Sequence, residues 1–138
     1  MKLFNKIALT LLIVNSISSQ ASDLLVVANT DATEFKVKKR QVRDIFMGNN
    51  SEFELKPVAL TPSSSARYIF NTKIVGLTES RIQSYWAQMR FSGRQKPPQE
   101  FESVEAMLAF VLSHKNTVAY LPSDTKVPDG LTVIYQTD

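Results

Sequence analysis

The alternation of short apolar runs with helical apolar stripes constrains the fold of this chain most. Residues 24–28 (Leu-Leu-Val-Val-Ala) are a continuous apolar run rich in β-branched side chains. Such a run predicts a strand buried on both faces, as in a parallel sheet. Further strands are predicted at residues 56–61, 117–121 and 131–135. Because helical patterns separate most of these runs, the sequence predicts α/β layers with at least some parallel pairing.

Four helices are predicted between the strands. They cover about residues 38–47, 63–73, 78–93 and 103–115, and Gly48, Gly76 and Gly93 supply stop signals. The third helix carries apolar side chains at positions i, i+3, i+4 and i+7, which are Ile82, Tyr85, Trp86 and Met89. Residues 94–98 are predicted to be a basic, proline-bearing loop.

The first 21 residues have the pattern of a cleavable secretory signal peptide. Lys2 and Lys6 precede an apolar stretch at residues 7–14, and Ser19-Gln20-Ala21 fits a cleavage site after Ala21. The apolar stretch is much shorter than the roughly 18 residues that a membrane anchor needs. No cysteine follows the site, which excludes a lipoprotein anchor. The sequence therefore predicts an exported domain at residues 22–138, with no stable membrane anchor after cleavage.

Composition narrows the function further. Removal of residues 1–21 from the 138 leaves 117, enough for one domain with its own core. The chain has no cysteine, which excludes disulfides, thiolate catalysis and cysteine metal sites. Without Lys2 and Lys6, 14 basic residues face 13 acidic ones, so the net charge falls from +3 to +1. This balance argues against nucleic acid as a partner.

Enzymatic patterns are weak. The single histidine, His114, falls at a helix end, where a structural role that matches the helix dipole is favoured. No carboxylate cluster has metal-ligand spacing, and no Gly-x-Ser-x-Gly motif surrounds Ser64, so a serine hydrolase is only a residual alternative. We expect no catalytic residues, no metal and no cofactor.

Two segments carry features of a binding site. Ser63, Ser64 and Ser65 stand where a predicted strand passes through Pro62 into a helix, with Arg67 in its first turn. Free N–H groups, hydroxyls and a guanidinium there make an oxyanion pocket one interpretation, although from spacing alone plain helix capping is the favoured explanation of the serines. Lys38, Lys39 and Arg40 begin another helix, where a solvated basic face is favoured over an anion or an acidic partner surface because exposed charges cost little.

An ordered set of segments resembles the phosphate-binding periplasmic proteins, the solute receptors of phosphate ABC transporters. Residues 41–48 (Gln-Val-Arg-Asp-Ile-Phe-Met-Gly) resemble the Ile-Phe-x-Gly helix end of that family. Residues 57–70 resemble its strand, Ser-Gly-Thr helix start and Phe. Tyr85-Trp86 with Phe91-Ser92-Gly93 resembles the Tyr-Trp…Phe-x-Gly segment of short members, and residues 117–121 stand in place of a Gly-x-Ile-Gly-Tyr-Val strand.

The resemblance implies a type 2 periplasmic-binding fold with a mixed, mostly parallel sheet flanked by helices. At 117 residues the predicted mature chain matches about one lobe of a two-lobed receptor. The phosphate loop also departs from the family pattern Arg-x-Asp-Gly-Ser-Gly-Thr. Leu60, Pro62 and Ala66 replace its Arg, Asp and Thr, and Ser64 alone retains a residue of the Ser-Gly-Thr triplet.

Two hypotheses follow. In the first, a non-enzymatic periplasmic protein binds phosphate or a related oxyanion weakly. The expected contacts are the backbone N–H groups of residues 64–67, the hydroxyls of Ser63, Ser64 and Ser65 and the guanidinium of Arg67, with Asn29 and Thr30 lining the same sheet edge. In the second, the lobe has lost solute binding and serves as an envelope interaction or assembly module through the basic segments 36–43 and 94–96.

Overall fold

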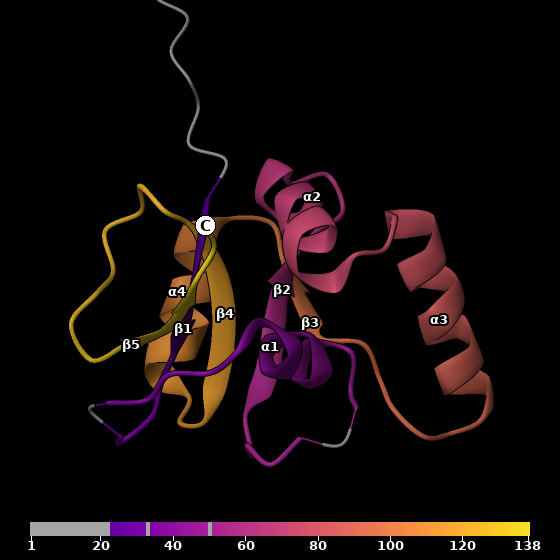
Figure 1. Cartoon of the computed structure of the whole chain (residues 1–138), viewed down its shortest axis with the longest axis horizontal. Helices are drawn as coiled ribbons and strands as arrows, with labels where there is room; N and C mark the ends of the chain where they lie inside the picture. The colour runs from indigo at the N-terminus through magenta and orange to yellow at the C-terminus, as the bar shows by residue number, and fades with distance from the viewer. Residues whose placement is uncertain (1–22, 33, 50) are drawn as a thin grey trace, which may run out of the picture.

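The computed structural model describes residues 23–138 except 33 and 50. The predicted signal peptide lies outside these residues, so its cleavage and the domain boundary stay predictions. Over the described residues the chain forms one five-stranded sheet with helices around it (Figure 1). The elements in chain order are β1 (Leu24–Ala28), α1 (Lys39–Phe46), β2 (Lys56–Leu60), α2 (Ser65–Phe70), the π-helical η1 (Asn71–Val75), α3 (Glu79–Phe91), β3 (Gln99–Phe101), α4 (Val104–Ser113), β4 (Thr117–Pro122) and β5 (Thr132–Gln136).

The sheet is mixed, with strand order β3-β2-β4-β1-β5. β2 pairs in parallel with β3 and β4, whereas β1 pairs antiparallel with both β4 and β5. In the described sheet four strands therefore run one way and β1 runs the other. The prediction that residues 24–28 are a buried strand is confirmed, but the parallel direction inferred from the run is wrong. An apolar run reports burial, and burial does not fix the strand's direction.

The helices lie on both faces of the sheet. Tyr120 of β4 stacks on Phe70 of α2 with ring centroids 4.1 Å apart, and Phe46 of α1 lies 5.7 Å away on the same side. Thr117, an odd number of positions from Tyr120, faces the opposite side, where its hydroxyl donates to the carbonyl of Val111 in α4. The sheet is thus sandwiched between α1 and α2 on one face and α4 on the other.

Two elements differ from the sequence prediction. The helix that follows the serine cluster changes at Asn71 into the π-helical η1, which ends at Gly76 with φ 74°. β3 was not predicted at all. It is a three-residue strand at the sheet edge that follows Pro97 and Pro98, and it is half-exposed or exposed throughout. A short edge strand carries no apolar run, so sequence periodicity misses it.

Helix α3 stands apart from the sheet, beyond β3 and η1 (Figure 1). Its predicted apolar face is confirmed, because Ile82 and Trp86 are buried and Tyr85 and Met89 are half-buried. The Tyr85 hydroxyl donates to the carbonyl of Met47, 2.7 Å away, and so ties α3 to the end of α1. Among the described residues, none of the helices has the length and apolar character to cross a bilayer.

Candidate functional site

The serine cluster lies in the turn from β2 into α2. The Ser64 N–H donates to the carbonyl of Thr61 over 3.0 Å, which closes the turn after the strand. Ser64 is the N-cap of α2, and its Oγ accepts from the Arg67 N–H at 3.5 Å. Ser63 and Ser65 are exposed, and the Ser63 hydroxyl lies 3.1 Å from that of Thr61. Capping therefore explains Ser64, and Thr61 is a hydrogen-bond partner for Ser63, whereas the Ser65 hydroxyl has no partner among the described residues.

The first turn of α2 also has unused backbone donors. Within the described part of the chain, no acceptor lies in hydrogen-bond range of the Ser65 and Ala66 N–H groups. A helix start leaves such groups to water or to a ligand. Two amides and the hydroxyls of Ser63 and Ser65 thus gather at the carboxyl end of β2.

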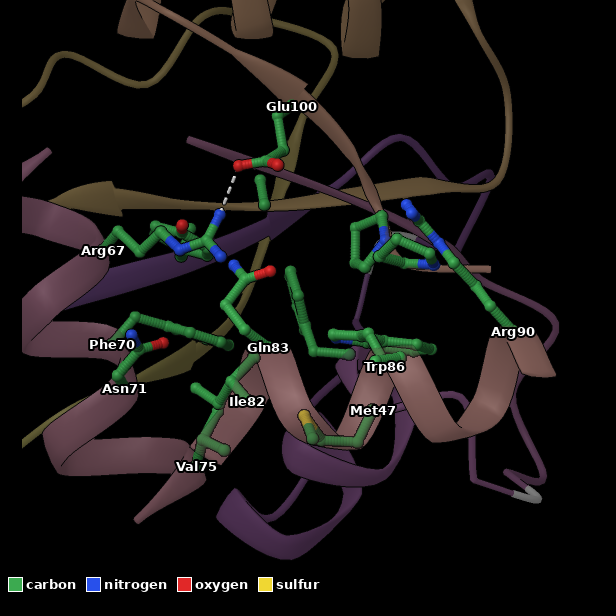
Figure 2. A pocket seen from close by; sticks show the side chains of 16 residues that line it. Met47, Arg67, Phe70, Asn71, Val75, Ile82, Gln83, Trp86, Arg90 and Glu100 are labelled. Atoms are coloured by element: carbon green, nitrogen blue, oxygen red, sulfur yellow. Dashed lines mark hydrogen bonds and ion pairs between the residues drawn. The ribbon is translucent and has the colours of Figure 1, made fainter. Parts of the chain in front are cut away.

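Arg67, expected to face the anion, is instead buried and ion-paired. Its side chain is 9% exposed. Nε and Nη2 donate to the two carboxylate oxygens of Glu79 over 2.6 and 2.8 Å, and Nη1 donates to Glu100 and to the carbonyl of Leu60 over 2.5 and 2.8 Å. Four of the five guanidinium donors are therefore occupied. The guanidinium therefore braces α2 against α3 and β3, and Figure 2 shows its ion pair with Glu100.

The ion pairs also set the pKa values of Arg67 and Glu79. Burial alone would raise the pKa of Glu79, but hydrogen bonds from Arg67, Gln83 and Asn71 outweigh it and lower that pKa. Burial likewise opposes the charged form of Arg67, yet its two carboxylate partners raise the Arg67 pKa. The Arg67 cation therefore faces the carboxylates of Glu79 and Glu100, and these three side chains together carry a formal charge of −1. They add no positive field at the start of α2.

Asn29 and Thr30 lie at the end of the sheet opposite the carboxyl end of β2, where the serines are. The prediction that they line the same edge of the sheet as the serines is therefore wrong. The reason is that β1 runs antiparallel to β4. Its last residue, Ala28, pairs with Val118 near the start of β4, and its first residue, Leu24, pairs with Pro122 at the carboxyl end of β4. Asn29 Nδ2 donates to the carbonyl of Val111 over 2.8 Å. It is a buried cap on the end of α4, not a ligand.

The remaining sequence candidates lie on the surface. Lys38, Lys39 and Arg40 are exposed at the start of α1, where the Lys38 N–H donates to the side-chain carbonyl of Gln41 over 2.7 Å. His114 ends α4, with its ring stacked 3.9 Å from Phe110 and Nδ1 2.8 Å from the Phe110 carbonyl. These local contacts fit the structural role predicted for His114.

No metal-binding group emerges from the described residues. Across residues 23–138, apart from positions 33 and 50, no set of three His, Asp or Glu side chains is arranged to hold an ion.

Sequence reasoning missed a pocket of about 190 Å³ between α3 and the body of the domain. Figure 2 shows Trp86 and Ile82 of α3 facing Phe70 and Val75 across it, with Arg67 and Glu100 at one end and Arg90 at the other.

Comparison with solved structures gives two similar proteins. An ABC-type phosphate transport receptor from Vibrio cholerae matches with a TM-score of 0.58 and 18% identity over 80% of this chain and 44% of the receptor. A putative phosphate ABC transporter substrate-binding protein from Clostridium perfringens, solved with bound phosphate, matches with a TM-score of 0.59 and 14% identity over 80% of this chain and 43% of its own. No protein-family model and no curated protein sequence matches.

The chain has a periplasmic-binding-protein fold. The predicted α/β class is confirmed, and the chain spans less than half the length of the two structures, consistent with a single lobe. At these identities the similarity concerns the fold alone.

Proposed function

We propose that this chain is an exported, non-enzymatic binding module that takes phosphate or a related oxyanion at the start of α2. The observation that carries the proposal is the pair of unused N–H groups, Ser65 and Ala66, beside the exposed hydroxyls of Ser63 and Ser65. Such groups at a helix start suit an anion. The phosphate named for the Clostridium perfringens structure supports this ligand class.

The proposed contacts are narrower than the sequence alone predicted. The Arg67 guanidinium is occupied by Glu79 and Glu100, and Asn29 is at the other edge, so neither takes part. The anion is held by amides and hydroxyls next to a cluster of net negative charge, on one open lobe. We therefore expect a dissociation constant in the millimolar range, on the order of 1–10 mM.

Calorimetric titration of the purified protein with phosphate and with sulfate tests the proposal. Ser65→Pro removes one of the two amide donors and still suits the first position of a helix, since Ser64 already has the extended backbone that a following proline requires. Ser65→Ala removes only the hydroxyl. We expect Ser65→Pro to abolish binding and Ser65→Ala to weaken it.

Val104→Pro is the matched control, because it changes the same first position in α4. It should leave phosphate binding unchanged. Absence of heat at about 10 mM phosphate, or equal binding by Ser65→Pro and the parent protein, would refute the proposed site.

A second candidate function is a protein-interaction module in the cell envelope. It is favoured by Phe91, which is 97% exposed at the end of α3 in a region that also holds the exposed cations Arg94 and Lys96. Substitution Phe91→Ser should remove a partner captured from periplasmic extract, whereas Tyr68→Ser, at a 71% exposed position on α2, should retain it. Charge reversal of Lys38, Lys39 and Arg40 tests the basic surface at the start of α1 in the same way. If the partner is still captured after Phe91→Ser and after this charge reversal, neither the Phe91 region nor the start of α1 is the interface.

A further inference from the structure

The pocket beneath α3 lies apart from the serine cluster, and none of the three serines lines it. α3 supplies one wall, and α1, α2, η1 and the sheet supply the other (Figure 2). Its volume of about 190 Å³ exceeds that of an engineered protein cavity of about 150 Å³ that takes up benzene. The pocket therefore accommodates a single aromatic ring with one small substituent.

The inner part of the pocket is aromatic. Phe70 and Tyr120 stack with centroids 4.1 Å apart and an interplanar angle of 14°, and Phe46 lies 4.6 Å from Phe70. Trp86 and Met47 complete this surface. Aromatic rings favour offset or edge-on contact with another ring, so the inner part suits an aromatic group.

The two ends of the pocket differ in charge. At one end Arg67 is paired with both Glu79 and Glu100, so these three side chains carry a formal charge of −1. At the other end Arg90 is exposed, and no carboxylate of the described residues lies within ion-pair distance of its guanidinium. A free cation at the mouth of an aromatic pocket attracts an anionic substituent, and a guanidinium matches a carboxylate in a bidentate geometry.

We propose that this pocket binds a small aromatic carboxylate. The ring lies among Phe70, Tyr120 and Trp86, and the carboxylate lies on the Arg90 guanidinium. Gln83 orients the ligand further: its Nε2 donates to Glu79 over 2.8 Å, which leaves its carbonyl oxygen free to accept from a hydroxyl or amino substituent on the ring. Inorganic phosphate fits this site poorly, because it has no apolar surface to bury.

Trp86 provides a direct readout, since the chain has one tryptophan and it lines the pocket. The indole N–H signal in a nitrogen–proton correlation spectrum should shift saturably with benzoate, with a dissociation constant on the order of 1 mM. Benzyl alcohol, which has the ring without the charge, should bind about tenfold more weakly, since a hydrogen bond to a charged group is lost. Phosphate should leave the signal unmoved.

Two variants of lining residues, Arg90→Gln and Ala87→Leu, and one control variant, Arg81→Gln, test the proposed contacts. Arg90→Gln should weaken benzoate binding about tenfold, whereas Arg81→Gln, an exposed cation on the same helix outside the pocket, should leave it unchanged. Ala87→Leu enlarges an exposed side chain on the pocket wall and should block binding without unfolding the protein. The proposal is overturned if benzoate gives no saturable shift, if benzyl alcohol binds equally well, or if Arg90→Gln and Arg81→Gln behave alike. None of these outcomes depends on phosphate binding at α2.

Discussion

Substitution of Arg67 by methionine tests whether this residue is a structural brace. Methionine keeps most of the apolar stem and removes the cation that joins α2 to Glu79 of α3 and Glu100 of β3. If Arg67 were a free ligand for anions, its loss would cost little stability in the absence of anion. Because it is ion-paired and 9% exposed, we expect its loss to destabilise the fold substantially.

The magnitude follows from the three groups that Arg67 leaves behind. Removal of one partner from a fully buried ion pair costs about 3–5 kcal/mol. Glu79 and Glu100 are 32% and 40% exposed, so water rehydrates them in part and the cost falls below that range. The Leu60 carbonyl also loses its 2.8 Å hydrogen bond from Nη1, at about 1 kcal/mol. We expect a total loss of about 3 kcal/mol in the free energy of unfolding.

Urea denaturation at neutral pH measures this loss, and Arg40→Met is the matched control. Arg40 is 82% exposed and lies 3.9 Å from Asp44, so its pair should contribute less than about 0.5 kcal/mol. The deficit of Arg67→Met should shrink in acid, where the carboxylates are protonated in both proteins. Equal stability of the Arg67→Met and Arg40→Met proteins would refute the structural role and restore Arg67 as a candidate ligand.

Three further predictions concern stability. The pKa of Glu79 is lowered in the fold, so its contribution to the free energy of unfolding is complete above the unfolded pKa of 4.5 and is lost as the pH falls through the folded pKa. Glu79→Gln should therefore reduce the loss of stability in acid, measured by urea denaturation at a series of pH values. Tyr120→Phe should cost about 1–2 kcal/mol by thermal unfolding, because the buried hydroxyl that accepts from the Leu60 N–H at 3.1 Å is lost while the ring stays. Burial raises the pKa of that hydroxyl to about 12, so in the folded state it should titrate well above the ordinary tyrosine pKa of 10.0. Gly48→Ala should destabilise more than Gly93→Ala in the same assay, because both have φ 68° but only at Gly48 would a Cβ lie 3.3 Å from neighbouring side chains.

The candidate site could be predicted from the sequence only in part. A helix cap among Ser63, Ser64 and Ser65 followed from the strand–proline–serine pattern, because capping is a local interaction within one turn, and in the structure the cap is Ser64. The position of Asn29 could not be predicted, because it depends on whether β1 runs parallel or antiparallel to β4, and apolar runs look the same in either case. The pairing of Arg67 with Glu100 joins residues 33 positions apart and leaves no local pattern.

The sequence by itself determined the α/β class, the position of most helices and strands, and the apolar face of α3 that carries Ile82 and Trp86. These features follow from periodicity and capping, which act over a few neighbouring residues. Only the tertiary structure decided which edge of the sheet each side chain reaches, that Arg67 is neutralised from within, and that α3 leaves a pocket whose free cation is Arg90 among the described residues. Strand direction and ion pairing are set by contacts between distant segments, and such contacts form only when the whole core assembles.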